Sequence, residues 1–380
     1  MGLVATEEQR LLRSTAEDFV KKESPIGRVR ELRDSQDSLG FSRKLWSAMA
    51  ELGWQGILVP EAYGGLGMGY AEIACVLEAL GRNLVPEPLL STALLGANAV
   101  LVAGTEEQKN AVLPGVANGS LILSLAWQER GSGFKPFALT STAKAVGDGY
   151  LLEGEKTLVL DGHAADHLVV SARSFGGPAD RDGVSLFLVE AGTPGLEVVR
   201  QSTMDLRNAA LVKFEGVELP ASAMMGEEGG AAASLEAILD GATLGLCAEM
   251  LGAMQAAFEM TLEYLKTREQ FGVVIGSFQA LKHRAAQIFV EIELSRSAVL
   301  GACEALDGGS PEAAEAVSIA KAKCSDTAVL VGYEGIQMHG GIGMTDEHDI
   351  GFYVKRAKAA ELTFGDAAWH RDRFATLRGF

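Results

Sequence analysis

The sequence predicts a multidomain α+β protein with a helical N-terminal domain, a middle antiparallel β domain and a C-terminal helical bundle. Apolar residues follow a helical period at first, switch to short β-rich runs at Ser120, and return to the helical period at Ala231. With 380 residues, the chain also exceeds the size at which one hydrophobic core usually stops growing. We therefore expect three domains, at residues 1–118, 119–225 and 226–380.

Helix starts and apolar spacing predict the N-terminal domain. Thr6 and Gln9 have the spacing of a capping box, so the first helix is expected to start there, and a second box starts at Thr105. The four glycines of Gly64–Gly69 predict a loop, because they cannot hold a regular element. Helices are expected between the two boxes at residues 45–52, 70–80 and 89–102.

The middle and C-terminal domains follow from the two changes of period. Runs such as LILSLAW and VSLFLVE predict short strands, with a hairpin turn at Asp148–Gly149, in a small barrel or sandwich. After Ala231, long helices joined by short loops predict a four-helix-type bundle. Its third helix is expected to begin at Ser310–Pro311, which suit the N-cap and first helical positions.

Composition and charge exclude several classes of protein. A net charge of −17 argues against binding to nucleic acid or to an anionic membrane, because both surfaces are negative. No run of about eighteen apolar residues lacks a charge or glycine, and the N-terminus has no basic-then-apolar signal, so we expect a cytoplasmic protein with no membrane-spanning helix. The four cysteines are far apart and the six histidines lack ligand spacing, so reduced core thiols and no metal site are expected.

Two segments about fifty residues apart carry the candidate binding chemistry: Thr267–His283, TREQFGVVIGSFQALKH, and Gln337–Gly343, QMHGGIG. In the first, a turn separates two helices, and Ser277 is expected to cap the second. Unpaired backbone N–H groups beside the permanent charge of Arg268 suit a phosphate group. The alternative is that Arg268 simply caps a helix C-terminus. Neither glycine cluster fits a Rossmann fingerprint, and no G-x-S-x-G accompanies HGGIG.

Taken together, the two segments resemble the signature of the acyl-CoA dehydrogenase family. The segments GWQGILVPEAYGGLGMG, GDGYLLEGEKTLV and FEGVELPASAMMGEEG resemble the same family in order and spacing, so the resemblance covers nearly the whole chain and implies the same helix–β–helix architecture. The matching residues are Arg268, Gln270, Phe271, Gly272, Phe278, Gln279, Gln337, Gly340, Gly341 and Gly343.

The resemblance implies an FAD site shared between subunits. Arg268 is expected to pair with the pyrophosphate of a neighbouring subunit's cofactor. Four further residues are expected around that contact, namely Gln270, Phe271, Phe278 and Gln279. Gln337, Gly340 and Gly341 are expected to approach from the partner side. The protein is then a homodimer, a homotetramer or a heterotetramer, with electron-transfer flavoprotein as the expected acceptor. For Phe271 and Phe278 the alternative is a place in the bundle core.

The implied reaction is α,β-desaturation of an acyl-CoA, in which a carboxylate removes the α-proton. The two positions at which the family carries that carboxylate are Phe364 and Ala242 here, and neither can take a proton. Asp366 and Glu249 are the nearby candidates for a base. The alternative for each is a structural carboxylate, and Asp366 suits an N-cap.

Further departures place Leu158 and Leu160 where the family has a Trp and a hydroxyl residue against the flavin. The details EALGRNLVPEPL and TFGDAAWHR resemble the subgroup acting on steroid, bile-acid and other bulky acyl-CoAs, some of which have two unlike subunits. Three hypotheses follow: an acyl-CoA dehydrogenase with an unusual base, a non-catalytic partner subunit, or an FAD-free acyl-CoA-binding or scaffold protein.

Overall fold

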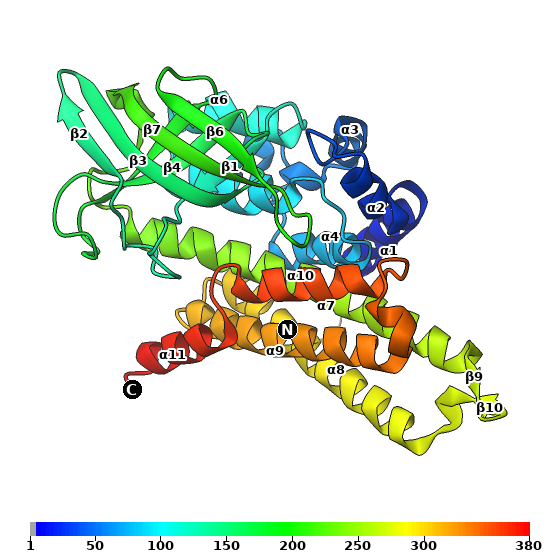
Figure 1. Ribbon diagram of the computed structural model, residues 1–380. Coiled ribbons are helices and arrows are strands. Elements are labelled where there is room, and N and C mark those ends of the chain that lie inside the picture. The colour runs from blue at the N-terminus through cyan, green and yellow to red at the C-terminus, as the bar shows by residue number, and fades with distance from the viewer. Residues whose placement is uncertain (1–4) are drawn as a thin grey trace. The chain divides into compact units, whose positions relative to one another are not determined.

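The computed structural model describes residues 5–380, which separate into two compact units, each considered by itself (Figure 1). We call them the helical unit and the sheet unit. The helical unit takes in the described part of Met1–Ser35, with Tyr70–Val85 and Thr243–Phe380. The sheet unit comprises Gln36–Gly69 and Pro86–Ala242.

The helical unit is a bundle in which α9 is central. Along α9 pack α8, α10 and α11, while α4 packs on α1 and α8 (Figure 1). A short hairpin of β9 and β10 and the 3₁₀ turn η5 connect α7 to α8, and the 3₁₀ turn η6 follows α9. The helix α7, Ala232–Thr267, begins in the sheet unit and continues into the helical unit. The other bounds are α1 Glu7–Glu23, α2 Gly27–Asp34, α4 Tyr70–Arg82, β9 Glu269–Gln270, β10 Val273–Val274, η5 Ile275–Ser277, α8 Gln279–Asp307, α9 Ala313–His339, η6 Gly340–Met344, α10 Ile350–Leu362 and α11 Ala367–Leu377.

The helix α7 is unusually long and apolar. By length and composition alone it could cross a membrane, a possibility that the sequence expectation had excluded. However, 89% of its most apolar 18-residue window is buried inside the protein, as in a helix that forms the core of a bundle. All four cysteines are also buried, as predicted.

The sheet unit contains one eight-stranded sheet in the order β6-β7-β3-β2-β4-β5-β8, with β1 paired to β4. Most pairs are antiparallel, but β1 runs parallel to β4. The path is open, so the middle domain is a curved sheet and not the closed barrel that one form of the prediction allowed. The strands are β1 Leu123–Ala126, β2 Thr142–Val146, β3 Gly149–Leu160, β4 His167–Arg173, β5 Val184–Glu190, β6 Leu196–Gln201, β7 Ala209–Pro220 and β8 Met224–Met225.

Helices and short turns complete the sheet unit. The predicted capping box at Thr105 is present, with its hydroxyl accepting from Gln108 N and the Gln108 side chain bonded to Thr105 N. In the helical unit, the box at Thr6 is present as well. The remaining elements are α3 Arg43–Glu51, η1 Trp54–Gly56, η2 Glu61–Tyr63, the π-helix η3 Leu90–Ala97, α5 Asn98–Ala103, α6 Glu106–Ala117 and η4 Ala221–Ala223.

Three predicted element ends are wrong by a few residues. The hairpin turn between β2 and β3 is Gly147–Asp148, because Val146 pairs with Gly149. Ser277 closes a 3₁₀ turn by donating to Val274 O at 2.7 Å, and Phe278 is the N-cap of α8. Ser310 accepts from Glu312 N in a turn, so that α9 begins later, at Ala313. For Ser277 and Ser310, a local turn takes the side chain that the pattern assigned to a cap.

Candidate active site

The predicted phosphate-binding segment forms a tight, exposed hairpin. Val273 pairs with Gln270 across β9 and β10, which leaves Phe271 and Gly272 as the two turn residues, with φ of 55° and 78°. Positive φ at both positions is the geometry of a two-residue hairpin turn, and it is costly for a bulky residue such as Phe. Phe271 is nevertheless 92% exposed, so the turn holds an aromatic ring out in solvent.

Arg268 lies at the base of this hairpin. Its backbone N–H donates to Tyr264 O at 2.9 Å and its carbonyl accepts from Ile275 N at 2.8 Å, so the backbone is anchored. Its side chain is exposed and, among residues 5–380, has no ion pair or hydrogen bond. The backbone therefore terminates α7, while the guanidinium remains available for an anion.

The two phenylalanines of the segment do not lie in the bundle core. Phe271 and Phe278 meet edge to face, with ring centroids 6.2 Å apart, and Phe278 is 37% exposed. Gln270 and Gln279 are exposed beside them. The hairpin thus presents an arginine, two aromatic rings and two amides on one short exposed segment.

The second segment, Gln337–Gly343, lies beside the end of α7. His339, the last residue of α9, is buried, and its ring packs 4.7 Å from that of Tyr264, which precedes Arg268 by one helical turn. The ring N–H at Nδ1 donates to Gly335 O at 2.7 Å. Burial lowers the pKa of His339 below its ordinary value, so the ring is neutral at physiological pH. The end of α7, just before the first predicted segment, therefore packs against the second segment within the helical unit.

Gly340 and Gly341 have open backbone. Gly340 has φ of 65°, which disfavours any residue with a Cβ, and a Cβ placed on either glycine would meet no atom within 4 Å. Gln337 is exposed one helical turn earlier. Open glycine backbone fits close approach to a phosphate-containing cofactor, and an exposed arginine fits its charge.

The position at which the family carries its carboxylate is a strained turn built over a buried lysine. Phe364 is buried at φ of 61°, and Gly365 follows at φ of 112°. Beneath the turn, Lys321 Nζ donates to Gly365 O at 2.7 Å, Glu361 O at 2.9 Å and Ser325 Oγ at 2.9 Å. Lys321 is completely buried, and burial lowers its pKa to about 8. All three ammonium protons thus bond to neutral oxygens that lock the turn.

Asp366 occupies the N-cap of α11. Its Oδ1 accepts from Trp369 N at 2.8 Å, which is the capping geometry that the sequence offered as the alternative to a base. The cap uses one carboxylate oxygen, and the side chain is half-buried. Its role as a base stays a prediction.

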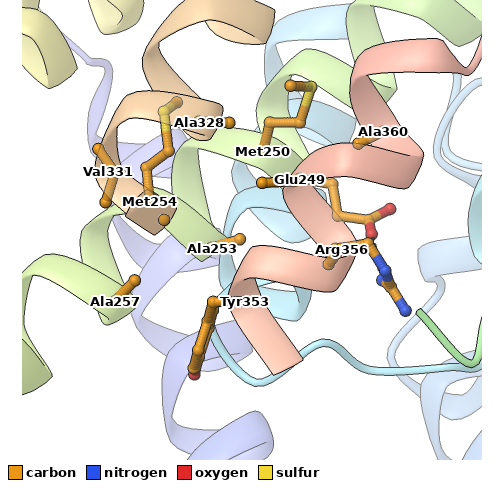
Figure 2. Close-up of a pocket in the computed structure, with 12 residues that line it drawn as sticks. Glu249, Met250, Ala253, Met254, Ala257, Ala328, Val331, Tyr353, Arg356 and Ala360 are labelled. Carbon is orange, nitrogen blue, oxygen red and sulfur yellow. Dashed lines mark hydrogen bonds and ion pairs between the residues drawn. The ribbon is translucent and has the colours of Figure 1, made fainter. Parts of the chain in front are cut away.

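Glu249 lies inside the bundle, paired with a buried arginine. Its Oε1 accepts from Arg356 Nη1 at 2.8 Å, which joins α7 to α10. Figure 2 shows the two side chains pointing at one another beside a cavity lined by methionines and alanines and by Tyr353. The cavity volume is about 10 Å³, room for about one water molecule and not for an acyl chain. The pairing occupies the Glu249 carboxylate, and its role as a base also stays a prediction.

Backbone strain marks the positions that the resemblance had singled out. Phe271, Phe364 and Leu158 are bulky apolar residues at φ of 55°, 61° and 53°. Leu158 sits at a bulge in β3, 48% exposed, where its N–H donates to Gln201 Oε1 at 3.1 Å. Such strain persists only when the surrounding structure enforces it, and it concentrates at functional sites.

Sequence reasoning missed Lys321, because a lysine in the run AKAKC has no feature that predicts burial.

The order of helices, sheet and helices, with an exposed arginine at a hairpin and a segment of open glycine backbone, defines a protein built like an acyl-CoA dehydrogenase. Three family models match the chain: acyl-CoA dehydrogenase N-terminal domain over residues 6–120, middle domain over 124–217 and C-terminal domain over 228–376. The chain belongs to the acyl-CoA dehydrogenase family, whose members are oxidoreductases.

Individual relatives are similar over their full length. The probable acyl-CoA dehydrogenase YngJ of Bacillus subtilis is 31% identical over 377 residues, which cover 98% of both chains. The Tcur3481–Tcur3483 steroid ACAD has a TM-score of 0.88 and 33% identity over 98% of both chains. The ChsE4–ChsE5 complex of Mycobacterium tuberculosis contains a chain with a TM-score of 0.89 and 29% identity over 100% of both.

Proposed function

We propose that this protein is an FAD-dependent acyl-CoA dehydrogenase that desaturates a bulky or branched acyl-CoA between its α and β carbons. The observation that carries the proposal is the exposed Arg268, which has no ion pair or hydrogen bond among residues 5–380, together with the open backbone of Gly340 and Gly341 in the same helical unit. The similarity to a steroid ACAD favours a bulky substrate.

The residues present fit FAD at these two segments. Arg268 would pair with the pyrophosphate, and Phe271 and Phe278 would supply apolar surface around it. Gly340 and Gly341 would let backbone approach the cofactor without a Cβ in the way. When bound, FAD supplies the acceptor for a hydride from the acyl β-carbon. The protein's part in the chemistry is to orient the thioester, exclude water and remove the α-proton.

A second subunit completes the site in this proposal. The hairpin and α8 expose large apolar side chains that a lone chain would leave in water, an arrangement that marks an interaction surface. On α8 these are Phe289, Val290 and Leu294. A second copy, or a related subunit, would cover this face and bring its own glycine segment to Arg268. Electron-transfer flavoprotein is the proposed electron acceptor.

The α-proton acceptor is either Asp366 or Glu249. Asp366 is favoured, because one of its oxygens is free of the cap, whereas Glu249 is held by Arg356. If neither residue acts as the base, the chain is the non-catalytic subunit of a two-protein dehydrogenase. Phe364 and Ala242 at the usual base positions favour this second function, as does the similarity to a chain of the ChsE4–ChsE5 complex.

The test begins with the purified protein and FAD. We expect a yellow protein whose flavin absorbance near 450 nm, a property of the cofactor, bleaches when bulky acyl-CoAs are added under anaerobic conditions. An active enzyme bleaches alone, whereas a partner subunit binds FAD and does not bleach. A colourless protein that takes up no added FAD contradicts both and leaves an acyl-CoA-binding or scaffold protein.

Two substitutions then locate the base. Asp366→Asn keeps a good N-cap residue, so it should preserve the fold while abolishing bleaching. Glu249→Gln removes the other candidate carboxylate, and its effect on folding is measured in parallel. Unchanged bleaching rates in both variants would eliminate both residues as the base.

A further inference from the structure

Two arginines of α2 hold the loop that follows the glycine segment. Arg33 makes a bidentate pair with Asp346, with Nη1 donating to Oδ1 at 2.7 Å and Nη2 to Oδ2 at 2.9 Å. Arg30 donates to Asp349 Oδ1 at 2.8 Å, to Asp346 Oδ2 at 3.2 Å and to the Asp346 carbonyl. More than three hundred residues of chain separate the partners. We call this group the α2 clamp.

Ring stacking adds to the ion pairs of the α2 clamp, in which the Asp346 side chain is 64% exposed. Both guanidinium groups lie over the ring of the buried Phe352, with Cζ 4.8 Å from the ring centroid for Arg30 and 5.5 Å for Arg33. Stacking on a fixed ring and bidentate bonding both restrict the side chains before the carboxylates are bound. The Arg33 guanidinium holds the pKa of Asp346 below its ordinary value, so the carboxylate stays charged at neutral pH.

Outside the α2 clamp, the loop has short local hydrogen bonds and one ring contact, that of His348 with the buried His339 at 4.3 Å between centroids. After η6, Thr345 N donates to Ile342 O at 3.0 Å, and His348 Nδ1 accepts from Ile350 N at 3.2 Å. Asp349 is the N-cap of α10, but its side chain makes no capping bond and turns to Arg30 instead. The clamp therefore supplies the hydrogen bonds that tie Asp346 and Asp349 to a distant part of the chain.

We propose that Arg30 and Arg33 are positioning residues for FAD, which act through Asp346 and Asp349 to preorganise the backbone of Gly340 and Gly341. A segment that is already ordered loses less conformational entropy when it closes on a ligand, so it binds more tightly. Neither arginine touches the cofactor in this role. The inference rests on the proposed FAD site.

The experiment compares FAD binding by Arg33→Gln, Arg33→Lys and Asp346→Asn with wild type. The dissociation constant of FAD, measured on apoprotein by flavin fluorescence, should rise roughly tenfold in Arg33→Gln and Asp346→Asn, because a charge-assisted bidentate pair is lost. Arg33→Lys keeps the charge without the bidentate fork, so it should recover part of the affinity. Without FAD, amide hydrogen exchange of residues 341–349 should be faster than in wild type. The increase should be largest in Arg33→Gln and Asp346→Asn and smaller in Arg33→Lys.

A matched control exists in the sheet unit. Arg181 makes a two-bond pair with Glu236 at 2.7 Å and lies 4.7 Å over the Phe137 ring, so Arg181→Gln removes the same chemistry away from the loop. It should leave FAD affinity within about twofold of wild type, which is within the effect of an ordinary exposed pair.

The outcomes separate this inference from the proposed function. If wild type binds FAD and the dissociation constant is unchanged in Arg33→Gln and Asp346→Asn, the positioning role of the α2 clamp is wrong and the proposed function stands. An equal loss in Arg181→Gln also overturns it, because the effect is then general. Wild type that binds no FAD overturns the proposed function and this positioning role with it.

Discussion

Removing the buried charge of Lys321 should change how the stability of the protein depends on pH. An ammonium group whose three hydrogen-bond acceptors are neutral oxygens is costly to bury, and this burial lowers its pKa from an ordinary 10.5 to about 8. At 1.36 kcal/mol per pKa unit, that difference amounts to about 3 kcal/mol of unfolding free energy. This cost is present in full below about pH 8.

The direction of the effect follows from proton binding. Between about pH 8 and pH 10.5 the unfolded chain holds a proton on Lys321 that the folded chain has released, so wild type gains stability as pH rises. Lys321→Met has no such proton. The difference in unfolding free energy between wild type and Lys321→Met should therefore shift in favour of wild type by up to about 3 kcal/mol across this window, at about 1.4 kcal/mol per pH unit.

The assay is urea unfolding followed by far-ultraviolet circular dichroism, at intervals from about pH 7 to pH 10.5. Taking the difference between the two proteins cancels the titration of groups that do not interact with Lys321. A difference that stays flat with pH would show that Lys321 keeps an ordinary pKa, and the reasoning from burial would be refuted. The loss of three hydrogen bonds in the variant shifts the whole curve without changing its slope.

The remaining predictions concern folding. Gly365→Ala should cost about 2 kcal/mol or more in thermal unfolding, because φ is 112° and the new Cβ would meet Trp369 Cε3 at 2.5 Å. Glu249→Gln and Arg356→Gln each break the buried pair, and each should lower the free energy of unfolding by about 3 kcal/mol, measured with urea. The double variant should lose less than the sum of the two single losses. Thr105→Ala should cost about 1 kcal/mol by loss of its capping box, in the same unfolding assay.

Each of these predictions has a result that contradicts it. Gly340→Ala is the control for Gly365→Ala, because its new Cβ would meet no atom and only the positive φ would be costly. If both variants lose the same stability, the clash with Trp369 is not the cause of the loss at Gly365. Strictly additive losses at Glu249 and Arg356 would mean that the two charges do not interact. For the cap, Thr105→Ser should keep nearly all the stability, and a loss equal to that of Thr105→Ala would exclude the hydroxyl as its cause.

The sequence predicted the helices and strands well because their signals are local. Capping boxes, apolar periods and glycine turns act over a few residues, and Thr6, Thr105 and Asp366 are the caps that the pattern predicts. Ser277 and Ser310 failed as caps because neighbouring turns took their hydroxyl groups. Cap position depends on how the chain arrives at the helix, which a residue pattern does not contain.

The candidate site was predictable only in part. The residues of the hairpin and the glycine segment came from the resemblance, but their exposure came from the structure, which removed Phe271 and Phe278 from the bundle core. Pairings across long sequence separations gave no signal at all. Lys321 under the Phe364 turn and Arg33 on Asp346 are examples, since an ordinary helical lysine or arginine is usually solvated.

By itself, therefore, the sequence determined the family, the order of helices and strands, and the absence of a carboxylate at Phe364 and Ala242. Those are properties of residue identity and of spacing along the chain. Only the tertiary structure decided that Glu249 is held by Arg356 and which charges are buried. Both depend on tertiary contacts, because desolvation and ion pairing arise from other segments of the chain. Those contacts determine whether a carboxylate is available as a base.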